Sequence, residues 1–83
     1  MERRTGFVGI ILENRNGVEE VNRVLSEHAE MILARMGLPR REKGIAVITL
    51  VVEATTDELG ALTGSLGKIP GVSVKSGLAK TRP

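Results

Sequence analysis

The sequence has no cysteine and only one histidine, and these two shortages exclude most metal and redox chemistry. Without cysteine the chain forms no disulfide, holds no thiolate zinc or iron–sulfur centre and offers no cysteine nucleophile. The single histidine, His28, has no histidine, cysteine or aspartate four residues further on to complete a metal pair. We therefore interpret His28 as a surface or structural side chain, with a ligand shared across an oligomer interface as the alternative. We expect no metal site and identify no cofactor.

Long hydrophobic runs are also missing. The longest one, Ile45 to Val52, is broken only at Thr49 and is far shorter than the roughly twenty residues of a membrane span. Residues 1–6 lead directly into Phe7 and contain no apolar region of an export signal. We therefore expect no membrane partner, a reducing compartment and a cytoplasmic location.

Neither sign of charge dominates, because 12 Lys and Arg against 10 Asp and Glu leave a net charge of only +2. The basic residues gather near the two ends and in one loop: Arg3, Arg4, Arg40, Arg41, Lys43, Lys75, Lys80 and Arg82. Such short clusters are typical of solvated loops, and contact with phosphate groups is the alternative.

A chain of 83 residues forms one domain. We place a flexible tail at residues 1–6, the domain at 7–80 and a second tail at 81–83. In so small a domain the free energy of apolar burial only about balances the cost of ordering the chain, and no disulfide adds to it. We therefore expect self-association, as a dimer or a tetramer.

The first half of the chain predicts a strand, a turn, a helix and a second strand. Phe7 to Glu13 is aliphatic and β-branched, which favours a strand. The turn Asn14–Gly17 follows, and Asn16 with Glu19 is close to a capping box for the next helix. Apolar residues then recur at helical spacing: Val18, Val21, Val24, Leu25, Ala29 and Ile32. Met31 to Leu38 favours a strand over a last helical turn.

The second half predicts a strand, a helix and a final strand. Ile45 to Ala54 is the strongest strand, and Thr55 with Glu58 forms a capping box for the helix that follows it. The apolar residues of that helix are Leu59, Leu62, Leu66 and Ile69, and alternation returns in Val72 to Lys80. The order βαββαβ predicts an α+β, ferredoxin-like fold, a four-stranded antiparallel sheet with both helices on one face.

Two features of the predicted elements indicate contact with another molecule. Both faces of the strand Ile45–Ala54 are largely apolar, and the chain's own helices cover one face only. The face of Val47, Thr49 and Val51, or the alternate one, is therefore an interface candidate, and alternation alone leaves the choice open. On the second helix the glycines cluster roughly 150° from the leucines, at Gly60, Gly64 and Gly67. They favour close approach by a subunit or ligand, or else a frayed helix end.

Catalytic and nucleic-acid readings find little support. The serines lie in no nucleophile elbow, and Glu13 and Glu53, at strand ends, are the one acid–base pair that we consider. RNA-recognition domains of this element order stack bases on aromatic side chains, whereas this chain has one Phe and no Tyr or Trp. Residues 64–67 match the GXXG of KH domains but lie within a helical pattern. We expect no enzyme and no direct DNA binding, and keep RNA binding as the least favoured alternative.

The turn Asn14-Arg15-Asn16-Gly17-Val18 resembles the first strand-to-helix turn of ACT domains, with Asn16 in place of the usual proline. Together with Leu12–Arg15, Val51–Glu53 and Asp57–Gly64, it is similar to a small ACT-like family of iron-only hydrogenase system regulators, over Phe7 to Leu78. The resemblance implies a homo-oligomer with ligands at subunit boundaries near the first turn. A related fold, the carboxy-terminal domain of nickel-responsive repressors, binds metal through histidines and a cysteine that this chain lacks.

Our leading hypothesis is therefore a non-catalytic regulatory or small-ligand-sensing module that acts as a homo-oligomer. The ligand-binding candidates are Asn14, Arg15, Asn16, Gly17 and Val18, where free N–H groups at the helix start favour an anion. A structural or scaffolding module that joins a partner through its apolar face is the alternative from a different class.

Overall fold

The computed structural model describes residues 2–40 and 44–80 and has the predicted βαββαβ order. The elements in chain order are β1 (Arg4–Leu12), α1 (Val18–Glu27), β2 (Ile32–Arg40), β3 (Ile45–Ala54), α2 (Thr56–Gly67) and β4 (Val72–Leu78). Two short 3-10 turns, η1 (Arg15–Gly17) and η2 (Ala29–Met31), precede and follow α1. The predicted α+β class is confirmed.

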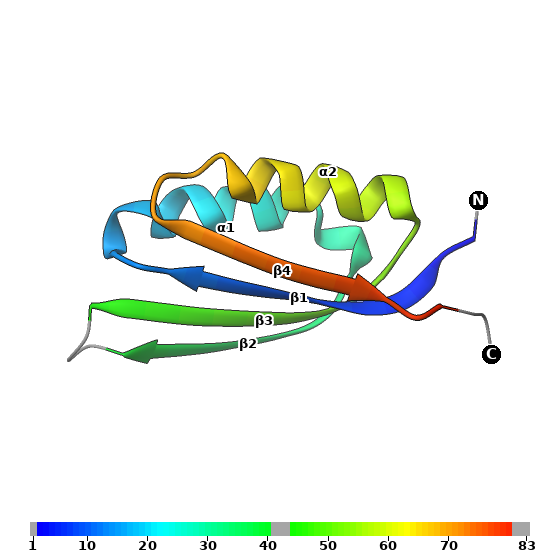
Figure 1. Ribbon diagram of the computed structural model, residues 1–83, viewed down its shortest axis with the longest axis horizontal. Coiled ribbons are helices and arrows are strands. Elements are labelled where there is room, and N and C mark those ends of the chain that lie inside the picture. The colour runs from blue at the N-terminus through cyan, green and yellow to red at the C-terminus, as the bar shows by residue number, and fades with distance from the viewer. Residues whose placement is uncertain (1, 41–43, 81–83) are drawn as a thin grey trace.

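The four strands form one antiparallel sheet in the order β2-β3-β1-β4, and both helices lie on one side of it (Figure 1). The two central strands, β1 and β3, are therefore distant in sequence and adjacent in space. Ile10 lies opposite Ile48 of β3 and Val74 of β4, which sets the register of the sheet. This is the predicted ferredoxin-like arrangement.

The core lies between the helices and the side of the sheet that they cover. In β3 the buried residues are Ile48, Leu50, Val52 and Ala54, so these side chains face the helices. From the other elements the core takes Val8, Ile10, Leu12, Val21, Val24, Leu25, Met31, Leu59, Leu62, Leu66 and Ile69. Alternation in the sequence left open which face of this strand the helices cover. They cover the face of Ile48, Leu50 and Val52, whereas Val47, Thr49 and Val51 point to the opposite side of the sheet.

The first strand begins earlier than the sequence predicts, at Arg4 rather than Phe7. Arg4 pairs with Ala54, and the Arg3 Nη2 donates a hydrogen bond to the Glu53 carbonyl oxygen at 3.1 Å. Residues 4–6, which the sequence places in a tail, therefore belong to β1, because β3 is long enough to pair with them. Arg41, Lys43 and the expected tail 81–83, Arg82 included, lie outside the described residues.

The predicted capping box of Asn16 and Glu19 is wrong. The Asn14 Oδ1 instead accepts a hydrogen bond from the Asn16 backbone N–H at 2.9 Å, which closes the 3-10 turn η1. Gly17 becomes the N-cap of α1, and because glycine has no side chain it accepts no hydrogen bond from the N–H groups of the first helical turn. Because Asn14 is extended (φ −152°), its short side chain reaches the N–H two residues on.

The end of α1 also differs from the expectation, because the helix stops at Glu27. Ala29 lies in the turn η2, and Ile32 is the first residue of β2, opposite Val52. The predicted strand in this region is confirmed, although it runs to Arg40. The reason is tertiary: Ile32 fits the apolar spacing of a helix and also that of a strand, and its pairing with Val52 of β3 makes it a strand residue.

The second helix follows its sequence pattern closely. The Glu58 N–H donates to the Thr55 Oγ1 at 3.1 Å, and the Thr55 N–H donates to the Glu58 Oε1 at 2.8 Å, which confirms the predicted capping box. The last strand ends at Leu78, two residues before Lys80. Within the described residues, no helix is both long and apolar enough to cross a membrane.

Candidate functional site

The turn between β1 and α1 packs against the turn between α2 and β4. The Glu13 backbone N–H donates to the Gly71 carbonyl oxygen at 2.8 Å. Gly71 has a φ of +80°, and a Cβ at this position would approach the Asn14 Nδ2 to 2.7 Å. Only glycine satisfies both the backbone angle and the close approach. The two turns are therefore fixed against each other.

The start of α1 is held against the end of α2. Gly17 is buried, and an added Cβ there would lie 3.1 Å from the Ile69 Cγ2 and 3.6 Å from the Val72 Cγ2. Glycine thus lets the first turn of α1 approach the chain segment that leaves α2. This close packing forms one end of a groove between the two helices.

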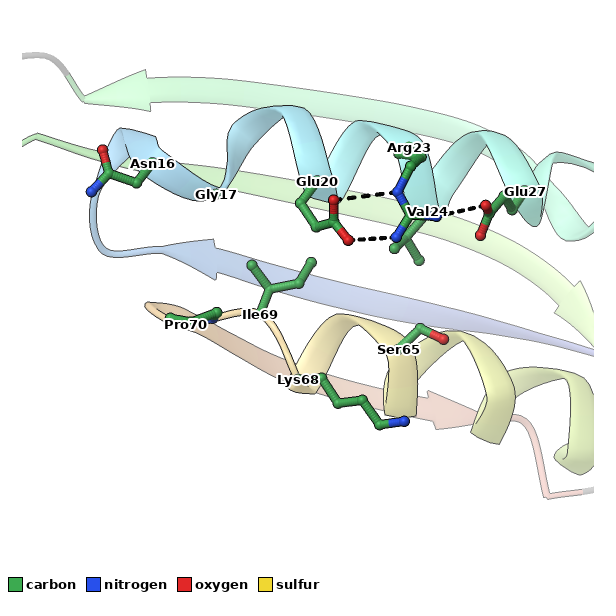
Figure 2. A pocket seen from close by; sticks show the side chains of 10 residues that line it. All are labelled: Asn16, Gly17, Glu20, Arg23, Val24, Glu27, Ser65, Lys68, Ile69 and Pro70. Atoms are coloured by element: carbon green, nitrogen blue, oxygen red, sulfur yellow. Dashed lines mark hydrogen bonds and ion pairs between the residues drawn. The ribbon is translucent and has the colours of Figure 1, made fainter.

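The groove has a volume of about 480 Å³ and opens on the helical face of the domain (Figure 2). Val24, Ile69 and Pro70 supply its apolar surface. Its polar lining comes from both helices and the first turn: Asn16, Gly17, Glu20, Arg23, Glu27, Ser65 and Lys68. The volume lies within the usual range for small-molecule sites, about 300–1,000 Å³.

One wall of the groove carries an ion network along α1. Arg23 forms an ion pair with Glu20, and its Nη1 donates to the Glu27 Oε2 at 2.6 Å. The hydrogen bond from Arg23 holds the pKa of Glu20 below its ordinary value. Lys68, directly after α2, also lines the groove, so two carboxylates and two cations line it. In Figure 2 the Lys68 side chain extends from the end of α2 away from the ion network. This balance suits a zwitterion better than a strong anion.

The structure brings only two of the five ligand-binding candidates to the groove, Asn16 and Gly17. Asn14 closes the turn and contacts the region of Gly71, and Val18 is half-buried against the core. Arg15 is exposed and does not line the groove.

Sequence reasoning did not identify the charged lining of the groove. Glu20, Arg23 and Glu27 are spaced three and four residues apart, which on a helix is the usual pattern of a solvated surface. Ser65 lies in α2 and Lys68 directly follows it, about forty residues away along the chain, and a pattern within one helix does not reveal its neighbour. The spacing of the three charged residues on α1 was the one available signal.

A second groove, of about 550 Å³, lies at the other end of the helical face. Half-buried His28 lines it, together with Arg3 and Glu58, which form an ion pair at 3.3 Å. The hydrogen bond from the Thr55 backbone lowers the pKa of Glu58. Within residues 2–40 and 44–80 no three His, Cys, Asp or Glu side chains are grouped so as to hold a metal ion.

The acid–base pair considered from the sequence, Glu13 with Glu53, does not form. Glu53 lies opposite Thr5, whereas Glu13 follows Leu12 at the far end of β1. Eight residues of strand separate the two positions, a distance of roughly 27 Å at about 3.4 Å per residue. The antiparallel pairing of β1 with β3 puts these two strand ends at opposite edges of the sheet, so the alternative of an acid–base pair, which the sequence did not favour, is ruled out.

The interface candidates lie on two different sides of the domain. Gly60, Gly64 and Gly67 face solvent from α2, and within the described part of the chain a Cβ added to any of them meets no atom within 4 Å. Val47, Thr49 and Val51 lie on the side of the sheet that faces away from the helices. No single flat partner surface reaches both sides of one domain.

Comparison with solved structures places the chain among ACT-like domains. An uncharacterised protein from Thermotoga maritima, TM1266, is 41% identical, with a TM-score of 0.91 over 95% of this chain and 100% of that one. The ACT domain of the GTP pyrophosphokinase of Chlorobium tepidum is 25% identical, with a TM-score of 0.77 over 89% of this chain and 97% of that one. The carboxy-terminal domain of MgtC from Mycobacterium tuberculosis, 15% identical, shares the fold, with a TM-score of 0.74 over 95% of this chain and 90% of that one.

Comparison of the sequence with family models gives the same result. The model that matches residues 4–76 is described as TM1266-like, with iron-only hydrogenase system regulator as a provisional role. No protein of curated function matches the chain. The match covers both the first turn and the Asp57–Gly64 segment on which the sequence resemblance rested. The chain therefore belongs to the TM1266-like family of iron-only hydrogenase system regulators.

Proposed function

We propose that this protein is a cytoplasmic, non-catalytic sensor of a small zwitterionic ligand, of the size of an amino acid, and that it acts as a homo-oligomer. Its readout is regulation connected with an iron-only hydrogenase, as the role given to its family suggests. The observation that carries the proposal is the charge-balanced groove between α1 and α2, which the first turn closes at one end.

The groove offers complementary groups for both ends of such a ligand. Glu20 and Glu27 accept hydrogen bonds from an ammonium group, and Lys68 attracts a carboxylate. Val24 and Ile69 provide an apolar surface for the remainder of the ligand. Its specificity then depends on the shape of that apolar surface.

A thermal-shift screen of amino acids, nucleotides and metal ions tests the proposal. A ligand that binds only the folded state at about 100 times its Kd stabilises that state by about 2.7 kcal/mol. For a chain of this size that is a rise in Tm of about 10 °C or more. We expect one amino acid or related zwitterion to give such a rise.

Two lysine variants locate the site. Lys68→Ala should weaken binding of the ligand found in the screen, because it removes the cation of one groove wall. Lys80→Ala is the matched control, since Lys80 is exposed beyond the end of β4 and does not line the groove. Equal loss of binding in both variants contradicts the assignment of the groove, and a screen in which no compound raises Tm contradicts ligand sensing.

The second candidate function is a scaffolding module, and the uncovered apolar side of the sheet favours it. Phe7, Met36 and Leu38 are among its exposed side chains. A failed ligand screen together with stable binding of a protein of the iron-only hydrogenase system to this side would support scaffolding over sensing.

A further inference from the structure

The side of the sheet that faces away from the helices, which we call the outer face, is apolar and uncovered. Figure 1 shows both helices on the other side of the sheet, and no described element crosses the outer face. Its large exposed side chains are Phe7 (51% exposed), Ile11 (43%), Met36 (70%), Leu38 (57%) and Val51 (41%). Contiguous apolar surface of this kind marks an interaction site.

The strand register arranges this surface in rows that cross β2, β3 and β1. The three rows are Ala34–Val51–Phe7, Met36–Thr49–Gly9 and Leu38–Val47–Ile11. The fourth strand, β4, ends these rows with Gly77, Lys75 and Ser73. The apolar patch is therefore centred on β3, at Thr49, and the polar side chains of β4 form its rim.

The patch contains a hollow and a protrusion in its middle row. Within the described residues, a Cβ added at Gly9 would meet only the Lys75 carbonyl oxygen inside 4 Å, at 3.8 Å. The Phe7 ring lies next to Gly77, whose added Cβ would be 2.9 Å from the Phe7 Cε1. Gly9 is thus the floor of a hollow between Phe7 and Ile11. Met36, the most exposed of the large apolar residues, protrudes from β2 in the same row.

The hollow and the protrusion lie at equal distances on the two sides of β3. Each neighbouring strand is about 4.8 Å from β3. A two-fold axis that runs along β3 through Thr49 exchanges β1 with the β2 of a second copy. The Met36 side chain of each copy then enters the hollow at Gly9 of the other, small Ala34 faces large Phe7, and Leu38 faces Ile11.

We propose that the outer face binds a second copy of this chain, about a two-fold axis along β3, with Met36 of each protomer seated in the Gly9 hollow of its partner. This inference rests on the homo-oligomer of the proposed function and adds its interface and symmetry. Two-fold interfaces join the same patch on both copies, and this patch carries both halves of its own complement.

The exposed surface of the chain agrees with a partner of this size. The chain of 8.9 kDa exposes 5489 Å², whereas a compact monomer of this mass exposes roughly 4,800 Å². A standard interface covers about 800 Å² on each partner. The difference of about 700 Å² is of the order of the area that one partner covers in a standard interface, and the elongated shape of the chain, 41 × 19 × 17 Å, also contributes to it.

A different axis fits the same face less well. A two-fold axis across the strands, through the middle row, places Gly9 over Gly9 and Met36 over Met36. The hollows at Gly9 then remain empty and the two Met36 side chains collide. Empty space and overpacking both weaken an interface. The axis along β3 has one unfavourable feature, since Glu53 of both copies lies on the same rim. Glu53 is exposed, where water and salt screen such repulsion.

Exchanging the hollow and the protrusion tests the inference. We expect sedimentation equilibrium to show a dimer of the unmodified chain at micromolar concentration. Gly9→Leu fills the hollow and should weaken the dimer by about tenfold to a hundredfold. The substitution leaves the monomer folded, because the added side chain extends into open space and the φ of Gly9 is not positive. Met36→Ala alone should also weaken the dimer.

The double variant Gly9→Leu with Met36→Ala should recover most of the lost affinity, because the protrusion now comes from β1 and the space from β2. Gly37→Leu is the matched control. Gly37 also has open space around it, but it lies opposite Ile48 and points to the helical side of the sheet. Gly37→Leu should therefore leave the dissociation constant of the dimer unchanged. Circular dichroism shows whether each variant is folded.

Every outcome decides the question. A double variant no tighter than Gly9→Leu overturns the contact between Met36 and Gly9. A dimer that none of these variants weakens overturns the outer face as the interface but leaves the homo-oligomeric sensor standing. A clean monomer of the unmodified chain at about 100 µM overturns the interface and the oligomer together. Ligand binding, followed separately by thermal shift, reports on the groove alone.

Discussion

Replacement of Gly71 by alanine measures how firmly the two turns at the groove are held together. Two contributions destabilise the Gly71→Ala variant. A left-handed backbone angle, here φ +80°, costs a residue with a Cβ about 1–2 kcal/mol. Loss of chain entropy in the unfolded state offsets about 0.4–1 kcal/mol of that cost. The net effect of the backbone angle is therefore about 1 kcal/mol.

The second contribution comes from Asn14. The new Cβ would approach the Asn14 Nδ2 to 2.7 Å, so the asparagine side chain must move. Its Oδ1 then loses the hydrogen bond from the Asn16 N–H, which is worth about 1 kcal/mol for a cap of this kind. The expected total is about 2 kcal/mol. For a chain of this length this lowers Tm by about 11 °C.

Gly44→Ala is the control that isolates the contact. Gly44 also has a positive φ, +68°, but within the described residues an added Cβ there meets no atom within 4 Å. Gly44→Ala should therefore cost about 1 kcal/mol, the backbone contribution alone. Thermal and urea unfolding at one fixed protein concentration measure both values, since the stability of a dimer depends on concentration.

A double-mutant cycle completes the test. In an Asn14→Ala background, Gly71→Ala should cost no more than Gly44→Ala, because the side chain that it displaces is gone. Equal costs for Gly71→Ala and Gly44→Ala in the unmodified background would refute the reasoning, as would an unchanged cost of Gly71→Ala after Asn14 is removed. Ligand affinity measured alongside tells whether the turn also shapes the groove.

Three further predictions concern the helices and the core. Thr55→Ala should lower the free energy of unfolding by about 1 kcal/mol in urea denaturation, because the confirmed capping box loses one of its two hydrogen bonds; Thr56→Ala, one residue later, should change it little. Because the folded-state pKa values of Glu20 and Glu58 are lowered, their contribution to stability is present above about pH 4.5 and decreases as pH falls through the lowered values; Glu58→Gln should flatten this dependence in urea titrations, and an identical pH profile would contradict it. Leu50→Ala should cost about 2–5 kcal/mol, since Leu50 is fully buried at the centre of the sheet, whereas Val51→Ala should chiefly weaken the dimer; a melting curve and a sedimentation run on each variant separate the two effects.

Local interactions made several parts of this protein predictable from the sequence. The capping box of Thr55 and Glu58 involves residues only three apart in the sequence. The segment Ile45–Ala54 is a short, almost wholly apolar run rich in β-branched residues, which predicts a strand and not a helix. The element order then restricts the topology, because only a few ways of joining βαββαβ bury all the apolar faces. The fold class therefore followed from local pattern and short-range chemistry.

Contacts between distant segments decided the rest. The side chain of Ile32 fits a helical stripe or a strand equally well, and pairing with Val52 makes it a strand residue. Lys68 and Arg23 each resemble ordinary surface charges until the packing of Gly17 against Ile69 brings the two helices together. A sequence pattern records the period of one element, whereas a groove depends on which two elements are neighbours.

The outer face shows most clearly which features the local sequence pattern predicts and which depend on contacts between distant segments. Alternation in β3 established two apolar faces but not which one the helices cover, because Val47 and Ile48 are equally hydrophobic neighbours on opposite sides. The direction of the crossovers places both helices over Ile48, and the register brings Met36 and Gly9 into one row two strands apart. The sequence determined the elements and their apolar faces, and only the tertiary structure, through strand order and register, determined which residues lie side by side.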